Sequence, residues 1–165
     1  MKHLALSLWQ PHASLIAEGV KLIETRSKKI NLRGDVLICS AQRLDASVRE
    51  EIKAYKNLGL LEPSFNLSNA FGKAIAMVEI YDCVPMTEEL RKDAALLETH
   101  AIEGKWGYLL RNIRPVRGVY AVKGGRGFFY VDSEDICRMP NIPLYSAYTE
   151  GDLQRIGAFR KARLR

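Results

Sequence analysis

The feature that most constrains the fold is the stretch over residues 7–26, in which a strand, a short helix and a second strand follow one another almost without linkers. Leucine at every second position over 4–8 predicts a half-buried strand. Pro11 is tolerated in a first helical turn and Gly19 permits a C-terminal stop, so a compact helix is predicted over 11–18. The short linkers must bring the start of the second strand close to the end of the first.

Several polar side chains lie where this helix leads into the second strand: Lys21, Glu24, Thr25 and Arg26. We expect them beside Trp9 and Gln10, at the end of the first strand. The residues alone leave two interpretations open. Glu24 and Arg26 share one face of a strand and can form a surface ion pair, which contributes little to stability. Alternatively, the polar group builds a binding or catalytic site.

The composition is that of one soluble globular domain. A chain of 165 residues is long enough to bury a core without cross-links, and 47% hydrophobic and 27% charged residues are ordinary values. No apolar run approaches the ~20 residues of a membrane span, and the first residues lead into a strand pattern instead of a signal peptide. We expect a cytoplasmic protein with no membrane partner.

The three cysteines, Cys39, Cys83 and Cys137, are widely spaced and lie in apolar contexts. An odd number of such cysteines predicts reduced thiols in the core, not a disulfide framework or a zinc site. No metal and no other cofactor is expected.

Positive charge is concentrated near the C-terminus. Lys and Arg outnumber Asp and Glu by six, and the last part of the chain is rich in basic residues: Arg155, Arg160, Lys161, Arg163 and Arg165. A polyanion such as RNA is the natural partner for this balance, although the charge alone also fits cytosolic proteins that bind no nucleic acid. We expect this segment, with Lys28, Lys29 and Arg33 of a basic connector, to contact phosphates, and RNA binding to weaken as salt rises.

Hydrophobic periodicity predicts the remaining elements. Short apolar runs predict strands over 35–41, 71–86, 106–116, 119–122 and 128–131. Helical spacing and capping residues predict a helix beginning at Asp45, another over 87–99, and a short basic one beginning at Thr149 or Asp152. Because closure hides the edges of so many short strands, we predict an α+β fold built on a closed or nearly closed β-barrel of five to seven strands with flanking helices.

Glu79 interrupts the most apolar of these strands, between Val78 and Ile80. A carboxylate there either faces solvent or is held inside by a partner, because an unpaired buried charge is very costly. The residues alone favour the solvent face.

Four segments together resemble the ASCH domain family: the helix with Gly-x-Lys-x-x-Glu-Thr-Arg over 19–26, RGDVLICSA over 33–41, GKAIAMVEIYDCVPM over 72–86, and NIRPVRG over 112–118. The resemblance extends over residues 4–131 and implies a PUA-like small β-barrel. It divides the chain into an ASCH domain over 1–132 and a basic C-terminal extension over 133–165 that packs on or next to it.

The resemblance also implies a function. PUA-like domains bind RNA or a modified nucleoside in a cleft beside the first helix, so Trp9, Gln10, Arg26, Lys28 and Arg33 are predicted ligand contacts. The alternative is a hydrolase, because some small ASCH proteins remove the acyl group from N4-acetylcytidine and ribonuclease activity has been ascribed to others. Such an enzyme would use Lys21 and Glu79.

The family's catalytic set is a lysine, a threonine three residues later and a glutamate in the central strand. Lys21 and Glu79 match, whereas Glu24 occupies the threonine position and Thr25 is displaced by one residue, which turns it to the opposite face of a regular strand. These four residues are the candidate catalytic group, and we expect Lys21, Glu24, Arg26 and Glu79 to meet in the cleft. Two neighbouring carboxylates would raise the pKa of Lys21 and make it an electrostatic anchor.

The histidines contribute no site at this stage. His3, His12 and His100 lie far apart in the sequence, so no paired-histidine ribonuclease site is predicted.

Overall fold

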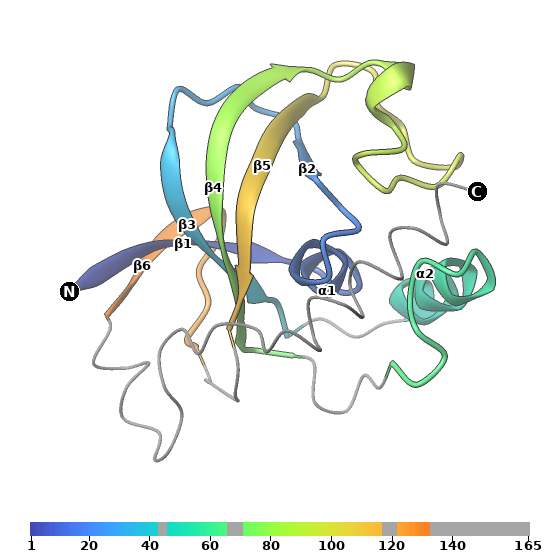
Figure 1. Cartoon of the computed structure of the whole chain (residues 1–165), viewed down its shortest axis with the longest axis horizontal. Coiled ribbons are helices and arrows are strands. Elements are labelled where there is room, and N and C mark those ends of the chain that lie inside the picture. The colour runs from blue at the N-terminus through green and yellow to red at the C-terminus, as the bar shows by residue number, and fades with distance from the viewer. Residues whose placement is uncertain (43–45, 66–70, 117–121, 133–165) are drawn as a thin grey trace.

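The structure, a computed structural model, describes residues 1–42, 46–65, 71–116 and 122–132. Six strands form one sheet with the order β2-β5-β4-β3-β1-β6 (Figure 1). The strands are β1 (Lys2–Leu8), β2 (Ile23–Arg26), β3 (Gly34–Ser40), β4 (Ala74–Pro85), β5 (Trp106–Pro115) and β6 (Phe128–Asp132). The helices are α1 (His12–Ala17), α2 (Ala46–Asn57) and a single 3₁₀ turn, η2 (Glu88–Leu90).

The sheet is mixed, because β1 and β3 pair in parallel while every other neighbouring pair is antiparallel. This confirms the α+β fold, and the six strands of the described residues lie within the predicted five to seven. Closure of the sheet is not confirmed: among the described residues, β2 and β6 end the order of paired strands and do not pair with each other. In Figure 1 the long strands β4 and β5 bend over α1, which lies in the concave side of the sheet.

The two faces of the sheet have different cores. On the α1 side, Ala76, Val78 and Ile80 of β4 pack in one cluster with Ala13 and Ile16 of the helix. On the other side, the alternate residues of the strands form a second cluster around Leu37, Cys39, Met77 and Val131. Burying each of the large aliphatic side chains stabilises the fold by about 1.5–3 kcal/mol. Successive residues of β4 therefore face different surroundings, which decides where its one glutamate lies.

The start and end of α1 follow from residues on either side of it. Gln10 is fully buried, and its side-chain oxygen accepts a hydrogen bond from the Ser14 N–H at 3.1 Å. At the other end Gly19 has φ +69° and its N–H donates to the Ile16 carbonyl at 2.8 Å, a geometry that glycine adopts without strain. The predicted helix with its glycine stop is confirmed.

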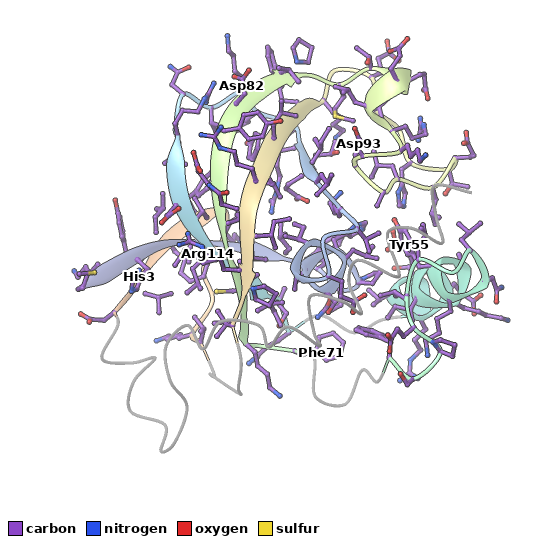
Figure 2. The ribbon with its side chains drawn as sticks, viewed as in Figure 1. His3, Tyr55, Phe71, Asp82, Asp93 and Arg114 are labelled. Carbon is purple, nitrogen blue, oxygen red and sulfur yellow. The ribbon has the colours of Figure 1, made fainter. Side chains whose placement is uncertain are left out.

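Helix α2 is also confirmed, with Val48, Ile52 and Tyr55 as its buried face. It packs beside α1 through Leu15, and the Tyr55 hydroxyl donates to the Ala95 carbonyl at 2.6 Å (Figure 2). Asp45, the predicted cap, lies outside the described residues.

The helix predicted over 87–99 is wrong. Only η2 is helical there, and the chain continues in turns in which Ala95 has φ +47°. Arg91 holds these turns by donating to the carbonyls of Leu97 and His100, each at 2.9 Å. Backbone carbonyls that a helix would have used internally are therefore available to bond side chains from elsewhere in the chain.

Some of the remaining predictions concern residues that the structure does not describe. Val122 is not in a strand, and the rest of the strand predicted over 119–122 lies outside the described residues; β6 pairs with β1. The extension over 133–165 and the helix predicted within it also lie outside the described residues.

Cys39 and Cys83 are buried free thiols, and burial raises the pKa of Cys39 to about 12. None of the described helices has the length and hydropathy needed to cross a membrane.

Candidate functional site

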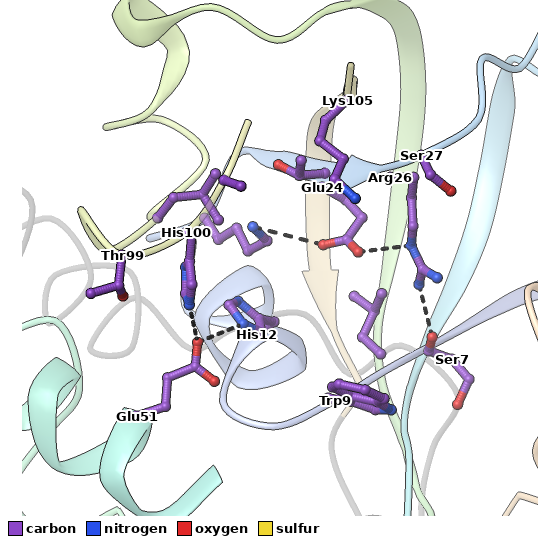
Figure 3. A pocket seen from close by; sticks show the side chains of 15 residues that line it. Ser7, Trp9, His12, Glu24, Arg26, Ser27, Glu51, Thr99, His100 and Lys105 are labelled. Atoms are coloured by element: carbon purple, nitrogen blue, oxygen red, sulfur yellow. Dashed lines mark hydrogen bonds and ion pairs between the residues drawn. The ribbon is translucent and has the colours of Figure 1, made fainter. Parts of the chain in front are cut away.

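A pocket of about 640 Å³ opens beside α1 (Figure 3). It is lined by the end of β1, the start of α1, the chain from residue 21 through β2, one residue of α2 and the turns that follow η2. The lining side chains that carry polar or aromatic groups are Ser7, Trp9, His12, Lys21, Glu24, Thr25, Arg26, Ser27, Glu51, Thr99, His100 and Lys105. Its volume lies within the roughly 300–1,000 Å³ of ordinary ligand sites.

Lys21 is buried at the inner side of this pocket, with 1% of its side chain exposed. Its ammonium donates to the Ala94 carbonyl at 2.6 Å and lies 3.7 Å from the Glu24 carboxylate. Burial lowers the pKa of Lys21, although the charge of Glu24 opposes this. The expected rise in the pKa of Lys21 is therefore wrong, because the cost of desolvating the ammonium outweighs its pairing with one carboxylate.

Glu24 connects Lys21 to Arg26. One carboxylate oxygen of Glu24 faces Lys21, and the other accepts from Arg26 Nε at 2.9 Å. Arg26 also donates through Nη2 to the Ser7 carbonyl at 2.9 Å, which ties β2 to the end of β1. Only 9% of the Glu24 side chain is exposed, so the Glu24–Arg26 pair belongs to the pocket and is not a surface ion pair.

Two cationic groups of the pocket keep donors available. Arg26 uses Nε and one N–H of Nη2, and its Nη1 has no partner among the described residues. Lys105, half-buried on the same wall, has no hydrogen-bond or ion-pair partner for its ammonium within the described part of the chain. Guanidinium and ammonium groups in this condition bind phosphate or carboxylate oxygens.

A second polar cluster lies at the opposite wall. Glu51 of α2 accepts through one oxygen, Oε1, from His12 Nε2 at 3.2 Å and from His100 Nε2 at 2.8 Å. The two imidazole centroids are 6.0 Å apart. The fold thus brings together two histidines that the sequence keeps far apart, although the prediction of no paired-histidine ribonuclease site concerned their chemistry and not their distance. Among the described residues, no cluster of histidine, cysteine and acidic side chains has the geometry of a metal site.

Hydrogen bonds assign the roles of these histidines. His100 Nδ1 accepts from the Leu97 N–H at 3.2 Å, so the ring hydrogen lies on Nε2 and is donated to Glu51. His12 Nδ1 is buried without a hydrogen-bond partner. Neither ring therefore presents a free nitrogen to the pocket for proton transfer, and the two histidines hold Glu51 in place instead of forming an acid–base pair.

Glu79 does not join the site. It alternates along β4 with Val78 and Ile80, which face α1, and so it lies on the opposite face of the sheet. There its carboxylate accepts from Arg111 and from the Asn112 amide. These hydrogen bonds lower the pKa of Glu79. The expectation that Glu79 meets Lys21 is wrong, whereas its 23% exposed side chain agrees with the solvent face that the residues alone favoured.

Of the other predicted site residues, some line the pocket and some do not. Thr25 and Trp9 line the pocket, and Trp9 is 54% exposed. Gln10, predicted as a ligand contact, is instead buried in the bond that begins α1. Lys28 and Arg33 also lie outside the lining, and Arg33 pairs with Asp82 at 2.8 Å on the surface. Both residues belong to the connector between β2 and β3.

Sequence reasoning missed His12, Glu51, His100 and Lys105. His12 could have been noticed as the first residue of a helix already assigned to the site. Glu51, His100 and Lys105 carry no local signal, since they come from elements whose packing on α1 only the fold reveals.

The family model for the ASCH domain matches residues 6–117. Among solved structures, the ASCH protein of Zymomonas mobilis has 16% identity and a TM-score of 0.49, with 81% of this chain and 90% of that chain covered. A serine-to-alanine mutant of the Zymomonas mobilis protein has 17% identity and a TM-score of 0.45, with 94% of each chain covered. Among curated proteins, no sequence matches the chain.

Proposed function

The chain belongs to the ASCH domain family, and on that premise we propose that it binds RNA, or a modified nucleoside, in the pocket beside α1. The observation that carries this proposal is the convergence of Trp9, Arg26 and Lys105 on one pocket. An exposed aromatic ring and unpaired cationic donors are the groups with which proteins hold single-stranded RNA.

Each of these groups has a role suited to its surroundings. Trp9 stands at the end of β1 with about half its surface in solvent, so a base can stack on it without moving the core. Arg26 is fixed by Glu24 and Ser7, which leaves its unpaired N–H groups oriented for a phosphate. Lys105 adds a second positive charge to the same pocket.

A second candidate function, amide hydrolysis of an acylated nucleoside such as N4-acetylcytidine, is favoured by one observation. Burial lowers the pKa of Lys21, which makes its neutral, basic form more accessible than that of an ordinary lysine. Glu24 lies 3.7 Å from that amine and is the nearer proton acceptor, because Glu79 is on the other face of the sheet. Trp9 and Arg26 would then orient the nucleoside.

A titration with a labelled single-stranded RNA of ~12 nucleotides at two salt concentrations tests the binding proposal. We expect binding that weakens as salt rises, and a loss of at least about fivefold in affinity for Trp9→Ala, because stacking on a base is worth about 1–3 kcal/mol. Tyr130→Ala is the matched control, since Tyr130 is 70% exposed on β6 and does not line the pocket. The same protein incubated with N4-acetylcytidine tests hydrolysis through release of acetate.

Three outcomes are informative. Equal losses for Trp9→Ala and Tyr130→Ala would contradict the pocket as the binding site. Release of acetate that disappears in Lys21→Met would favour the hydrolase over the binding module. No binding of RNA or of nucleoside by the intact chain would refute the proposal.

A further inference from the structure

One carboxylate oxygen of the pocket is left unused. Both histidines bond Oε1 of Glu51, and its Oε2 has no hydrogen-bond or ion-pair partner among the described residues. The side chain lines the pocket and is 19% exposed. Glu24, the other carboxylate of the lining, directs one oxygen to Arg26 and the other to Lys21. Glu51 therefore supplies the one lining carboxylate oxygen that the described residues leave unpaired.

The orientation and charge of this carboxylate are fixed before any ligand arrives. His100 can donate only through Nε2, because its Nδ1 accepts from Leu97, and His12 holds the same oxygen from α1. Partial burial alone would raise the pKa of Glu51, but the hydrogen bonds from His100 and His12 lower it to about 2. Glu51 is thus an ionised acceptor at neutral pH, and its two histidine partners have no donor left to offer in its place.

We propose that Glu51 reads the base of the bound nucleotide and selects one that presents an amino group, so that the pocket prefers cytosine to uracil. An ionised carboxylate can only accept hydrogen bonds. Cytosine offers an N4 amino donor at the edge where uracil has the O4 carbonyl, an acceptor that would face the carboxylate without a bond. A site built for a donor rejects the analogue that lacks it, since a buried polar group is then left unpaired.

The rest of the pocket fits this division of roles. Arg26 and Lys105 carry donors and positive charge, which suit the phosphate, and Glu51 lies on the wall formed with α2 and the turns after η2. A nucleotide presents an anion at one end and a base edge at the other. The inference rests on the proposed function, because it concerns the ligand of the same pocket.

Cytidine and uridine 5′-monophosphates test it, since they match in size and charge and differ at the base edge. We expect calorimetric titration of the intact chain at neutral pH to show cytidine monophosphate binding at least about tenfold more tightly, the value for one hydrogen bond to a charged group. Glu51→Gln should reduce this preference to about threefold or less, because an amide both accepts and donates. Glu50→Gln, an exposed neighbour on α2, is the matched control and should keep the wild-type preference.

The outcomes separate this inference from the function on which it rests. Equal affinities for the two nucleotides, or tighter binding of uridine monophosphate, by a protein that binds RNA would overturn the role of Glu51 and leave RNA binding intact. Failure of the intact chain to bind either nucleotide or the RNA would overturn both. Should Glu51→Gln not fold, as judged by circular dichroism, the ratio measured on the wild-type chain alone decides.

Discussion

Two carboxylates on the two faces of the sheet show how burial changes what an ion pair does. Glu24, on the pocket side, has 9% of its side chain exposed and lies between Lys21 and Arg26. Glu79, on the far side, is 23% exposed and bonds Arg111, which is 57% exposed. Both were candidates for one site, yet only the first shares a pocket with groups that can meet a ligand.

The difference is one of solvation. Water screens the Glu79–Arg111 pair, so it contributes little and can be lost without leaving a charge stranded. Around Glu24, by contrast, two cations depend on one carboxylate, and the desolvated Lys21 has no other acid within ion-pair distance among the described residues. The buried face can therefore orient a ligand, because its side chains cannot relax into solvent.

The largest loss of stability is expected when the buried carboxylate, Glu24, is removed. Glu24→Ala should destabilise the fold by about 3–5 kcal/mol, the cost of leaving a buried charge without its partner. Arg26 would also lose the bond that orients its guanidinium. Urea denaturation followed by circular dichroism measures the change in the free energy of unfolding.

Lys21→Met is the matched control for that substitution. It removes the buried cation and keeps the Glu24–Arg26 pair, so it should cost clearly less than Glu24→Ala, mainly through the lost bond to the Ala94 carbonyl. If Lys21→Met proved the more damaging, Lys21 would matter chiefly as a support of the turns after η2, and the argument from stranded charge would fail.

An intermediate effect is expected for Glu51, and it should depend on pH. The pKa of Glu51 is lowered from 4.5 to about 2 in the folded protein. A group with a depressed pKa contributes stability that is complete above its unfolded pKa and is lost as the pH falls through the folded value. Relative to Glu51→Gln, the wild-type chain should gain on the order of 3 kcal/mol at pH 7, and this gain should vanish between pH 4.5 and about 2.

Unfolding of both proteins at a series of pH values measures this difference. Other carboxylates with lowered pKa values, such as Glu88, titrate equally in both chains and cancel in the comparison. A difference that stayed constant from pH 6 to pH 2.5 would show that the histidine bonds do not depend on the charge of Glu51.

Local patterns predicted much of the fold. Helical spacing located α2, the glycine at position 19 marked the end of α1, and the alternation of leucines located β1. The helix predicted over 87–99 is a single 3₁₀ turn, and Thr87, the predicted cap, makes no side-chain hydrogen bond to cap it. Tertiary hydrogen bonds override helix propensity in the residues that follow, because the carbonyls of Ala94 and Ala95 accept from the side chains of Lys21 and Tyr55.

The sequence predicted some of the residues that line the pocket and missed others, for a physical reason. Lys21, Glu24, Thr25 and Arg26 lie within six residues of the chain and so reach the pocket together. Glu51 and His100 reach the pocket because α2 and the turns after η2 pack on α1. Residue spacing along the sequence does not predict this contact between elements. Glu79 shows the converse, because strand alternation in β4 already argued for the outer face and the resemblance pointed to the pocket.

The smallest effect is expected at Glu79. Glu79→Gln keeps the size of the side chain and can still accept from Arg111, so both RNA affinity and any release of acetate from N4-acetylcytidine should stay within about twofold of wild type. Asn112→Ala, which removes its second bond, serves as a control for changes in the outer face that leave the charge in place. Both variants should be compared with Glu24→Ala in the same titration, at a temperature where all three are folded. A loss of binding or hydrolysis in Glu79→Gln alone would show that the far face of the sheet takes part in function, and the division between the two faces would have to be abandoned.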